Sequence, residues 1–236
     1  MKKSRIATLI VFFALIPLTL IVGSRLSGRA FYVTSTLVIV ELLIPFFLAF
    51  EGRRPQAREL VVLAVMCALA VAGRVAIPIP SFKAIFGIIM IAGIAFGPES
   101  GFLVGAISAL ASNFFYSQGP YTPWQMMAYG AGGMLAGFVF AEGRLPRKPV
   151  VMGIFGFLAV AFFVGPLLDT CSVFLVMSRI SLKGAMAFYI SGFPVNLRQA
   201  VATAIVLLVL GKPLLEKLDR IKTKYGILDD EGRKEA

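Results

Sequence analysis

The sequence predicts an all-α integral membrane protein with about eight transmembrane helices. Of its 236 residues, 58% are hydrophobic and only 15% are charged, a balance typical of proteins embedded in lipid rather than of soluble domains. A helix needs roughly 20 apolar residues to cross a hydrocarbon core of about 30 Å. Several apolar runs approach that length, and no hydrophilic stretch is long enough for a separate soluble domain.

The apolar runs divide the chain into three parts. We expect residues 1–58 to form two N-terminal transmembrane helices and a linker, and residues 59–212 to form a six-helix membrane core. Residues 213–236 are rich in basic side chains and predict a cytoplasmic tail. The eight expected segments are residues 6–23, 31–50, 60–77, 84–97, 101–115, 124–141, 150–168 and 193–211.

Two of these elements need a separate justification. The first run, residues 6–23, is long and lacks a following small-residue cleavage site, so we expect a retained helix rather than a signal peptide. The runs 84–97 and 101–115 are short for full spans and are joined by the sequence GPESG. Such a turn is too tight for anything but a hairpin between two helices.

The distribution of positive charge sets the expected orientation. The chain has 23 Lys and Arg against 12 Asp and Glu. With the N-terminus placed inside, most of the basic residues fall in inner segments, as the positive-inside rule requires. We therefore expect a multi-pass protein of the cell membrane with both termini cytoplasmic. The charges lie between apolar runs rather than on one binding face, so the net charge of +11 does not indicate nucleic acid.

Three expected outer connections, residues 78–83, 114–130 and 169–192, carry the unusual residues. The stretch 114–130, FFYSQGPYTPWQMMAYG, holds the chain's only tryptophan. Flat rings with polar tips, interleaved with amides, suit a pocket for a ring-containing organic molecule. An interfacial aromatic belt is the alternative, but it does not explain the glutamines and prolines among the rings. The residues expected to bind are Tyr116, Gln118, Tyr121, Trp124, Gln125 and Tyr129.

Polar groups at the start of the last apolar run form a second candidate set. Asn196, Arg198 and Gln199 are expected near the outer end of that helix, below the outer loops. Charged groups in membrane segments are costly and usually face partners or a polar cavity. Glu41, near the middle of the second run, has no partner that the sequence assigns.

A stripe of small residues marks the third run. Ala64, Ala68 and Ala72 are spaced by four, which places them on one face of a helix. Small side chains let a second helix approach closely. The stripe is therefore either a packing face within the bundle or a docking face for another membrane protein. For the glycines at 130, 133 and 137, internal packing is the favoured interpretation.

Nothing in the sequence indicates an enzyme. Histidine is absent, which removes the commonest general base near neutral pH and the commonest metal ligand. No Walker-type phosphate loop and no paired-aspartate motif occurs. We predict no catalytic residue, no metal site and no cofactor. Energy for transport then comes from partner subunits or an ion gradient, so a stand-alone ion-coupled secondary transporter or channel, with Glu41 or Asp169 as proton site, is the alternative function.

From Glu59 to Leu210 the chain resembles the substrate-binding S components of energy-coupling factor (ECF) vitamin transporters. The resemblance rests on the alanine-striped helix, the hairpin IIMIAGIAFGPESGFLVGAISALASNFF, the aromatic loop and the glycine-rich AYGAGGMLAG. It implies a six-helix core that captures a vitamin or related micronutrient from outside, while a transmembrane coupling subunit and two ATPase subunits drive uptake.

The resemblance also implies roles for individual residues. It assigns contact with the coupling subunit to Ala64, Ala68 and Ala72, and adds Phe82 and Asp169 in the outer loops to the substrate site. The loop pattern QGPYTPWQM looks most like S components linked to cobalamin-type uptake, so a cobalamin-like ligand is expected. The two additional N-terminal helices depart from the family pattern.

Overall fold

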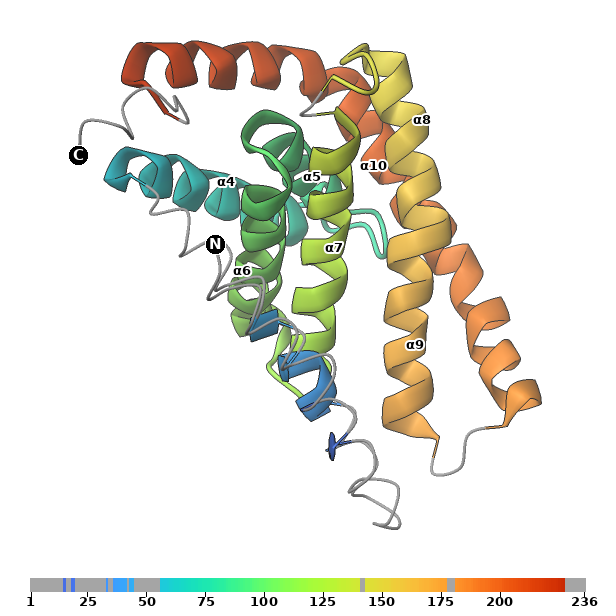
Figure 1. The fold of residues 1–236 in the computed structure, drawn as a ribbon. Coiled ribbons are helices and arrows are strands. Elements are labelled where there is room, and N and C mark those ends of the chain that lie inside the picture. The colour runs from blue at the N-terminus through green and yellow to red at the C-terminus, as the bar shows by residue number, and fades with distance from the viewer. Residues whose placement is uncertain are drawn as a thin grey trace.

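The computed structural model describes residues 56–140, 143–177 and 181–227, together with isolated positions between 15 and 44. Every element assigned in the three continuous ranges is a helix, so the all-α prediction is confirmed for this part of the chain. In chain order these are α4 (Ala57–Val75), α5 (Ile85–Phe96), α6 (Pro98–Tyr116), α7 (Thr122–Phe140), α8 (Pro149–Ala159), a π-helical turn (Val160–Val164), α9 (Gly165–Val176) and α10 (Leu182–Tyr225), as Figure 1 shows.

Two helical stretches in the described residues are long and apolar enough to cross a membrane. These are Pro149–Val176, which joins α8 to α9, and Leu182–Tyr225, which is α10. The shorter α5 is also apolar. The count of about eight transmembrane helices stays a prediction, and most of residues 1–55 lie outside the described part.

Helix α5 is the centre of the fold. All twelve of its residues are buried, and α4, α6, α7, α8 and α10 all pack against it. Twelve residues rise only about 18 Å, well short of a bilayer core. Helix α5 is therefore shorter than a full membrane span, and its apolar surface is covered by protein.

The predicted hairpin between the short runs is confirmed. Only Gly97 separates α5 from α6, and its φ of 92° is a conformation that side-chain-bearing residues rarely adopt. Pro98 follows at the first position of α6, where its missing N–H costs no helical hydrogen bond. We call the end of the bundle with this turn the Gly97 end, and the opposite end, with the α6–α7 loop, the Tyr116 end.

Glycines let α5, α6 and α7 touch backbone to backbone. A methyl group added at Gly93 of α5 would collide with the carbonyl of Gly133 on α7. One added at Gly133 would collide with the carbonyl of Gly101 on α6, and Gly137 lies against Pro98 in the same way. The interpretation of the α7 glycines as internal packing residues is therefore confirmed.

Helices α8 and α9 form one continuous rod through a π-helical turn. Pro166 lies directly after that turn, in the first turn of α9. Proline has no N–H, and its ring clashes with the carbonyl four residues earlier. The wider π-helical turn accommodates this clash without ending the helix.

Helix α10 is 44 residues long and contains two prolines. Ser181 caps its start by accepting the N–H of Gly184 at 3.1 Å. A straight helix of this length would reach roughly 66 Å, about twice a bilayer core. Pro194 and Pro213 each remove a backbone hydrogen bond, and Figure 1 shows α10 turning near its end to run across the other helices.

Two expected boundaries are wrong. The connection expected over residues 169–192 is mostly helical, because α9 continues to Val176 and α10 already begins at Leu182. The run 193–211 is only the middle of α10, and residues 213–225 continue the same helix. The two prolines of α10 indicate helix ends in the sequence. In lipid, however, a helix is the arrangement that pairs its backbone groups within the segment, so the helix bends at each proline instead of ending there.

Cationic side chains cover the carbonyl end of α5. Arg147 donates to the carbonyl of Ile94 at 3.1 Å, and Lys222 of α10 donates to the carbonyl of Ala95 at 2.7 Å. Arg147 also pairs with Asp219 at 3.4 Å. The last carbonyls of a helix have no helical donor and carry partial negative charge. The α7–α8 loop and the end of α10 thus close the Gly97 end over α5.

The isolated N-terminal positions contact the core on one side. Leu43 is buried against Phe102 and Ala106 of α6. Thr19 donates to Glu41 Oε1 at 2.6 Å, which supplies a partner for the carboxylate that the sequence left unassigned. The two expected N-terminal helices otherwise lie outside the described residues.

Replacing Gly133 by alanine should lower the free energy of unfolding by about 1–3 kcal/mol, because the new methyl group forces two backbones apart. Thermal unfolding in detergent measures the change. Gly132→Ala is the matched control, since its methyl group would meet the Val164 side chain rather than a backbone. Equal losses in the two variants would contradict the backbone contact.

Candidate substrate-binding site

Buried polar side chains gather toward the Tyr116 end. Ser112 and Asn113, near the end of α6, are both 0% exposed. Arg74 of α4 donates to Ser112 Oγ and, at 2.9 Å, to Asn113 Oδ1. Asn113 Nδ2 donates to Thr122 Oγ1 at 3.0 Å, at the start of α7. We call these four residues the Arg74 cluster; it joins α4, α6 and α7 by hydrogen bonds.

Two tyrosine rings lie over the guanidinium of Arg74. Its Cζ is 4.8 Å from the ring centroid of Tyr116 and 5.7 Å from that of Tyr129, distances typical of cation–π contacts. The Tyr116 hydroxyl donates to the backbone carbonyl of Arg74 at 3.0 Å. Tyr129 is buried and meets Phe86 of α5 edge-on, with centroids 4.5 Å apart. Two predicted binding residues thus surround one partly buried charge.

The loop before α7 is held by its own polar side chains. Gln118 Oε1 accepts from Thr122 Oγ1, and Gln118 Nε2 donates to the carbonyl of Leu110, both at 3.0 Å. The Tyr121 hydroxyl donates to the carbonyl of Ser117 at 2.7 Å. Gln118 and Tyr121 therefore fix the loop through internal hydrogen bonds.

Trp124 and Gln125 differ from their neighbours because each leaves a polar atom unused. Trp124 is only 9% exposed and its ring stacks on Phe174 of α9, with centroids 5.4 Å apart. Within the part of the chain that the structure describes, the buried Trp124 Nε1 and Gln125 Oε1 have no hydrogen-bond partner. A buried polar atom without a partner costs about 1–3 kcal/mol. One free donor and one free acceptor thus lie on adjacent residues of α7.

Asp169 and Asn196 join α9 to α10. Asn196 Nδ2 donates to Asp169 Oδ2 at 2.7 Å. Gly165 and Gly192 leave the space that this pair fills, since a methyl group at either glycine would collide with Asn196 or Asp169 respectively. The structure therefore brings two predicted binding residues together as partners of each other.

The loop between α4 and α5 connects α10 to the aromatic residues. Gln199 Nε2 donates to the backbone carbonyl of Lys83 at 2.7 Å, and Lys83 Nζ lies 6.0 Å from the ring centroid of Tyr116. Phe82 is half-buried in the same loop. Arg198 is exposed on α10, and the contacts described above do not include it.

A family model described as "ECF-type riboflavin transporter, S component" matches residues 55–216, which is more than half of the chain. The chain belongs to this family. No curated protein and no solved structure matched it. The S component is a membrane protein that binds the substrate of an ECF transporter, and it is not an enzyme. Such subunits bind a small-molecule vitamin and pair with ECF coupling and ATPase modules.

The described residues limit the chemistry that is available for ligand binding. No group of three or more Cys, Asp or Glu residues among them could hold a metal ion. The two cysteines, Cys67 and Cys171, are buried and unpaired with each other. The S component therefore offers rings, amides and one partly buried guanidinium as its ligand-binding chemistry.

Sequence reasoning missed four residues of this region: Ser112, Asn113, Thr122 and Phe174. The signal for Asn113 was present, since it is an amide within the otherwise apolar end of the run 101–115. Arg74 was likewise not assigned to the site from the sequence. Its partners became visible only when α4 and α6 were placed side by side.

The predicted docking alanines lie on the free side of α4 in this S component. Ala64, Ala68 and Ala72 are all exposed. Ala68 and Ala72 border an open apolar groove of about 480 Å³ between α4 and α6. The groove is lined by Cys67, Ala68, Val71, Ala72, Val75, Ala111 and Phe115. Packing inside the described bundle does not use this stripe.

Asn113→Ala should lower the free energy of unfolding of the S component by about 1–3 kcal/mol, because Arg74 and Thr122 each lose a buried partner. Thermal unfolding in detergent is the measurement. Gln118→Ala is the comparison, since this exposed side chain bonds at the surface and its loss should cost less. A larger loss in the Gln118 variant would contradict the central place of Asn113.

Proposed function

We propose that this S component binds riboflavin, or a closely related flavin, at the Tyr116 end. A transmembrane coupling subunit and two ATPase subunits then drive its uptake. The family description names riboflavin, whereas the expectation of a cobalamin-like ligand rests on one loop pattern. The substrate proposed here is therefore a flat ring system rather than a corrinoid.

The observation that carries this proposal is the pair of unused polar atoms on α7. A flavin ring has carbonyl oxygens and an imide N–H along one edge. Trp124 Nε1 can donate to such a carbonyl, and Gln125 Oε1 can accept from such an N–H. The tyrosine rings beside Arg74 supply flat apolar area for the remainder of the ligand.

The other predicted residues have a positioning role in this proposal. Asp169 and Asn196 hold α9 to α10, and Gln199 holds α10 to the α4–α5 loop. These contacts set where Phe82, and Phe174 of α9, lie relative to α7. Arg198 is outside the proposed site because its side chain is exposed on α10.

The orientation is part of the same proposal. The Gly97 end carries Arg147 and the basic end of α10 with Lys222, which supports placing that end and both termini in the cytoplasm. The Tyr116 end then faces outward, where a nutrient arrives. The ATPase subunits would act from the opposite, cytoplasmic end.

The α4 groove is the proposed docking face for the coupling subunit. Small side chains at Ala64, Ala68 and Ala72 allow close approach of a partner helix. Leu43 packs on Phe102 and Ala106, a different face of α6 from the one that borders the groove. This contact places Leu43 away from the groove.

Riboflavin fluorescence should be quenched on titration with purified S component and saturate at one ligand per chain. Trp124→Phe removes the donor but keeps a ring, and Gln125→Leu removes the acceptor; each should weaken binding about tenfold through loss of one hydrogen bond in a buried site. Tyr225→Phe, at the end of α10 away from the site, is the control that should bind normally.

Cobalamin titrated in parallel decides between the two ligands. Saturable cobalamin binding without riboflavin binding would refute the flavin proposal while leaving the family intact. Unchanged riboflavin affinity in both α7 variants would show that Trp124 and Gln125 do not contact the ligand. Uptake by the S component alone, abolished when the ion gradient is dissipated, would favour a secondary transporter instead.

Ala68→Trp should reduce co-purification of the coupling subunit at least about tenfold, because a bulky ring fills the α4 groove. Riboflavin titration of the same variant should stay normal, since Ala68 takes no part in the contacts described for Trp124, Gln125 or the Arg74 cluster. Leu69→Trp is the matched control, an exposed position on α4 outside the groove. Normal co-purification of the Ala68 variant would show that the coupling subunit does not dock in the α4 groove.

A further inference from the structure

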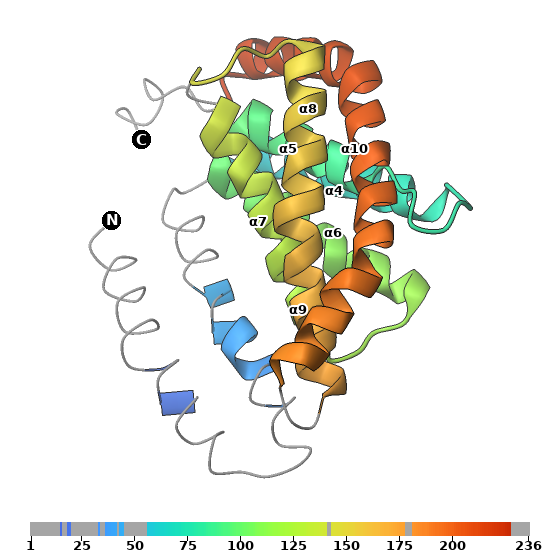
Figure 2. The same ribbon diagram turned by 90° about the vertical axis from the view of Figure 1, so that its right-hand side faces the viewer.

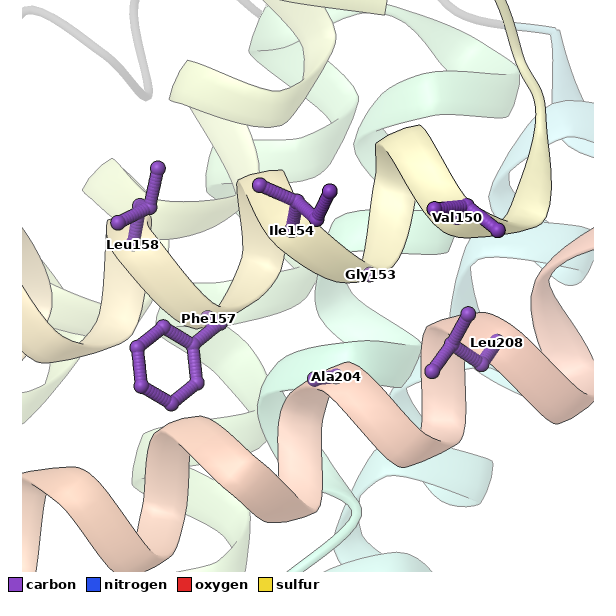
Figure 3. A pocket seen from close by; sticks show the side chains of 7 residues that line it. All are labelled: Val150, Gly153, Ile154, Phe157, Leu158, Ala204 and Leu208. Atoms are coloured by element: carbon purple, nitrogen blue, oxygen red, sulfur yellow. The ribbon is translucent and has the colours of Figure 1, made fainter.

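A second groove lies between α8 and α10, which run side by side (Figures 1 and 2). Its volume is about 350 Å³, and Figure 3 shows its lining residues on the two helices. They are Val150, Gly153, Ile154, Phe157, Leu158, Ala204 and Leu208. Because Gly153 and Ala204 are small, a hollow remains between larger apolar side chains. It is distinct from the α4 groove and from the proposed riboflavin site.

The groove has the length of one lipid leaflet. Along α8 it extends from Val150, in the first turn, to Leu158. These eight helical steps cover about 12 Å, close to half of a hydrocarbon core of about 30 Å. Its start lies at the Gly97 end, so the groove faces one leaflet only.

Two lysines lie next to the residues that line the Gly97 end of the groove. Lys148 is the residue immediately before α8, and Lys212 follows Leu208 by one turn on the same face of α10. Both are exposed. Lys212 lies 3.9 Å from Glu216, but both side chains are more than half exposed, and such surface pairs contribute little. A negative group entering here would meet two cations.

We propose that the α8–α10 groove binds one anionic phospholipid of the leaflet at the Gly97 end. One acyl chain lies along Ile154, Phe157 and Leu208, and the phosphate lies between Lys148 and Lys212. Basic residues next to an apolar cleft between helices are typical of anionic headgroup sites. Exposed apolar side chains continue past the groove at Phe162 and Phe193, but a transmembrane helix or a second copy of the chain would have no use for the two lysines.

Native mass spectrometry of the delipidated full chain, titrated with phosphatidylglycerol or phosphatidylcholine, tests the site. Wild type should retain one phosphatidylglycerol, with at least about a tenfold preference over phosphatidylcholine. Lys148→Gln with Lys212→Gln should remove most of that preference. Ala204→Phe should fill the hollow and reduce retention of both lipids severalfold.

Matched variants separate this site from general lipid contact. Val209→Phe enlarges an exposed apolar side chain beside the groove but outside its lining, and Lys183→Gln removes a charge near the other end of α10; both should leave retention unchanged. Equal retention of the two lipids by wild type, or unchanged preference in the double lysine variant, would overturn the proposal. Dimers lost specifically in Ala204→Phe would assign the groove to a second copy instead.

Discussion

The burial of α5 on every side is the constraint on which the other helices depend. A twelve-residue helix with no exposed residue can form only if its neighbours approach to backbone distance, because larger side chains would leave no room. Gly93, Gly101 and Gly133 meet that requirement where α5, α6 and α7 touch. The Gly97 turn then fixes the direction of α6, and the end of α6 positions Ser112 and Asn113 of the Arg74 cluster.

Charges are compensated differently at the two ends of the bundle. At the Gly97 end, α5 presents carbonyls without helical donors, and Arg147 and Lys222 supply cationic donors that also complement the helix dipole. Toward the Tyr116 end, Arg74 brings a charge inward, and its partners among the described residues are side-chain dipoles and rings rather than a carboxylate. That arrangement leaves an environment of oriented hydrogen-bonding groups, which suits an uncharged or weakly charged organic ligand.

The sequence predicted the elements whose signals are local. The hairpin at Gly97 and the packing glycines of α7 followed from composition and spacing, and the resemblance to S components agrees with the family match. The length of α10 could not be predicted from the sequence, because Pro194 and Pro213 normally indicate helix ends. Packing and a lipid environment favour one bent helix over separate segments. The Arg74 cluster was missed for a related reason: Arg74 and Asn113 are far apart in sequence, and neither residue alone predicts the other.

Two unused polar atoms also bear on how such a site discriminates between ligands. If Trp124 Nε1 and Gln125 Oε1, which have no partner among the described residues, are also unpaired in the free protein, they carry a desolvation penalty that a ligand with a matching carbonyl and N–H removes. A ligand of similar shape without those groups fills the same space but leaves the penalty in place. Sites built around buried hydrogen-bonding groups reject such analogues far more strongly than apolar pockets reject a missing methylene. Under the proposed function, selectivity for the flavin edge therefore comes from α7, and the surrounding rings contribute affinity that many flat molecules would share.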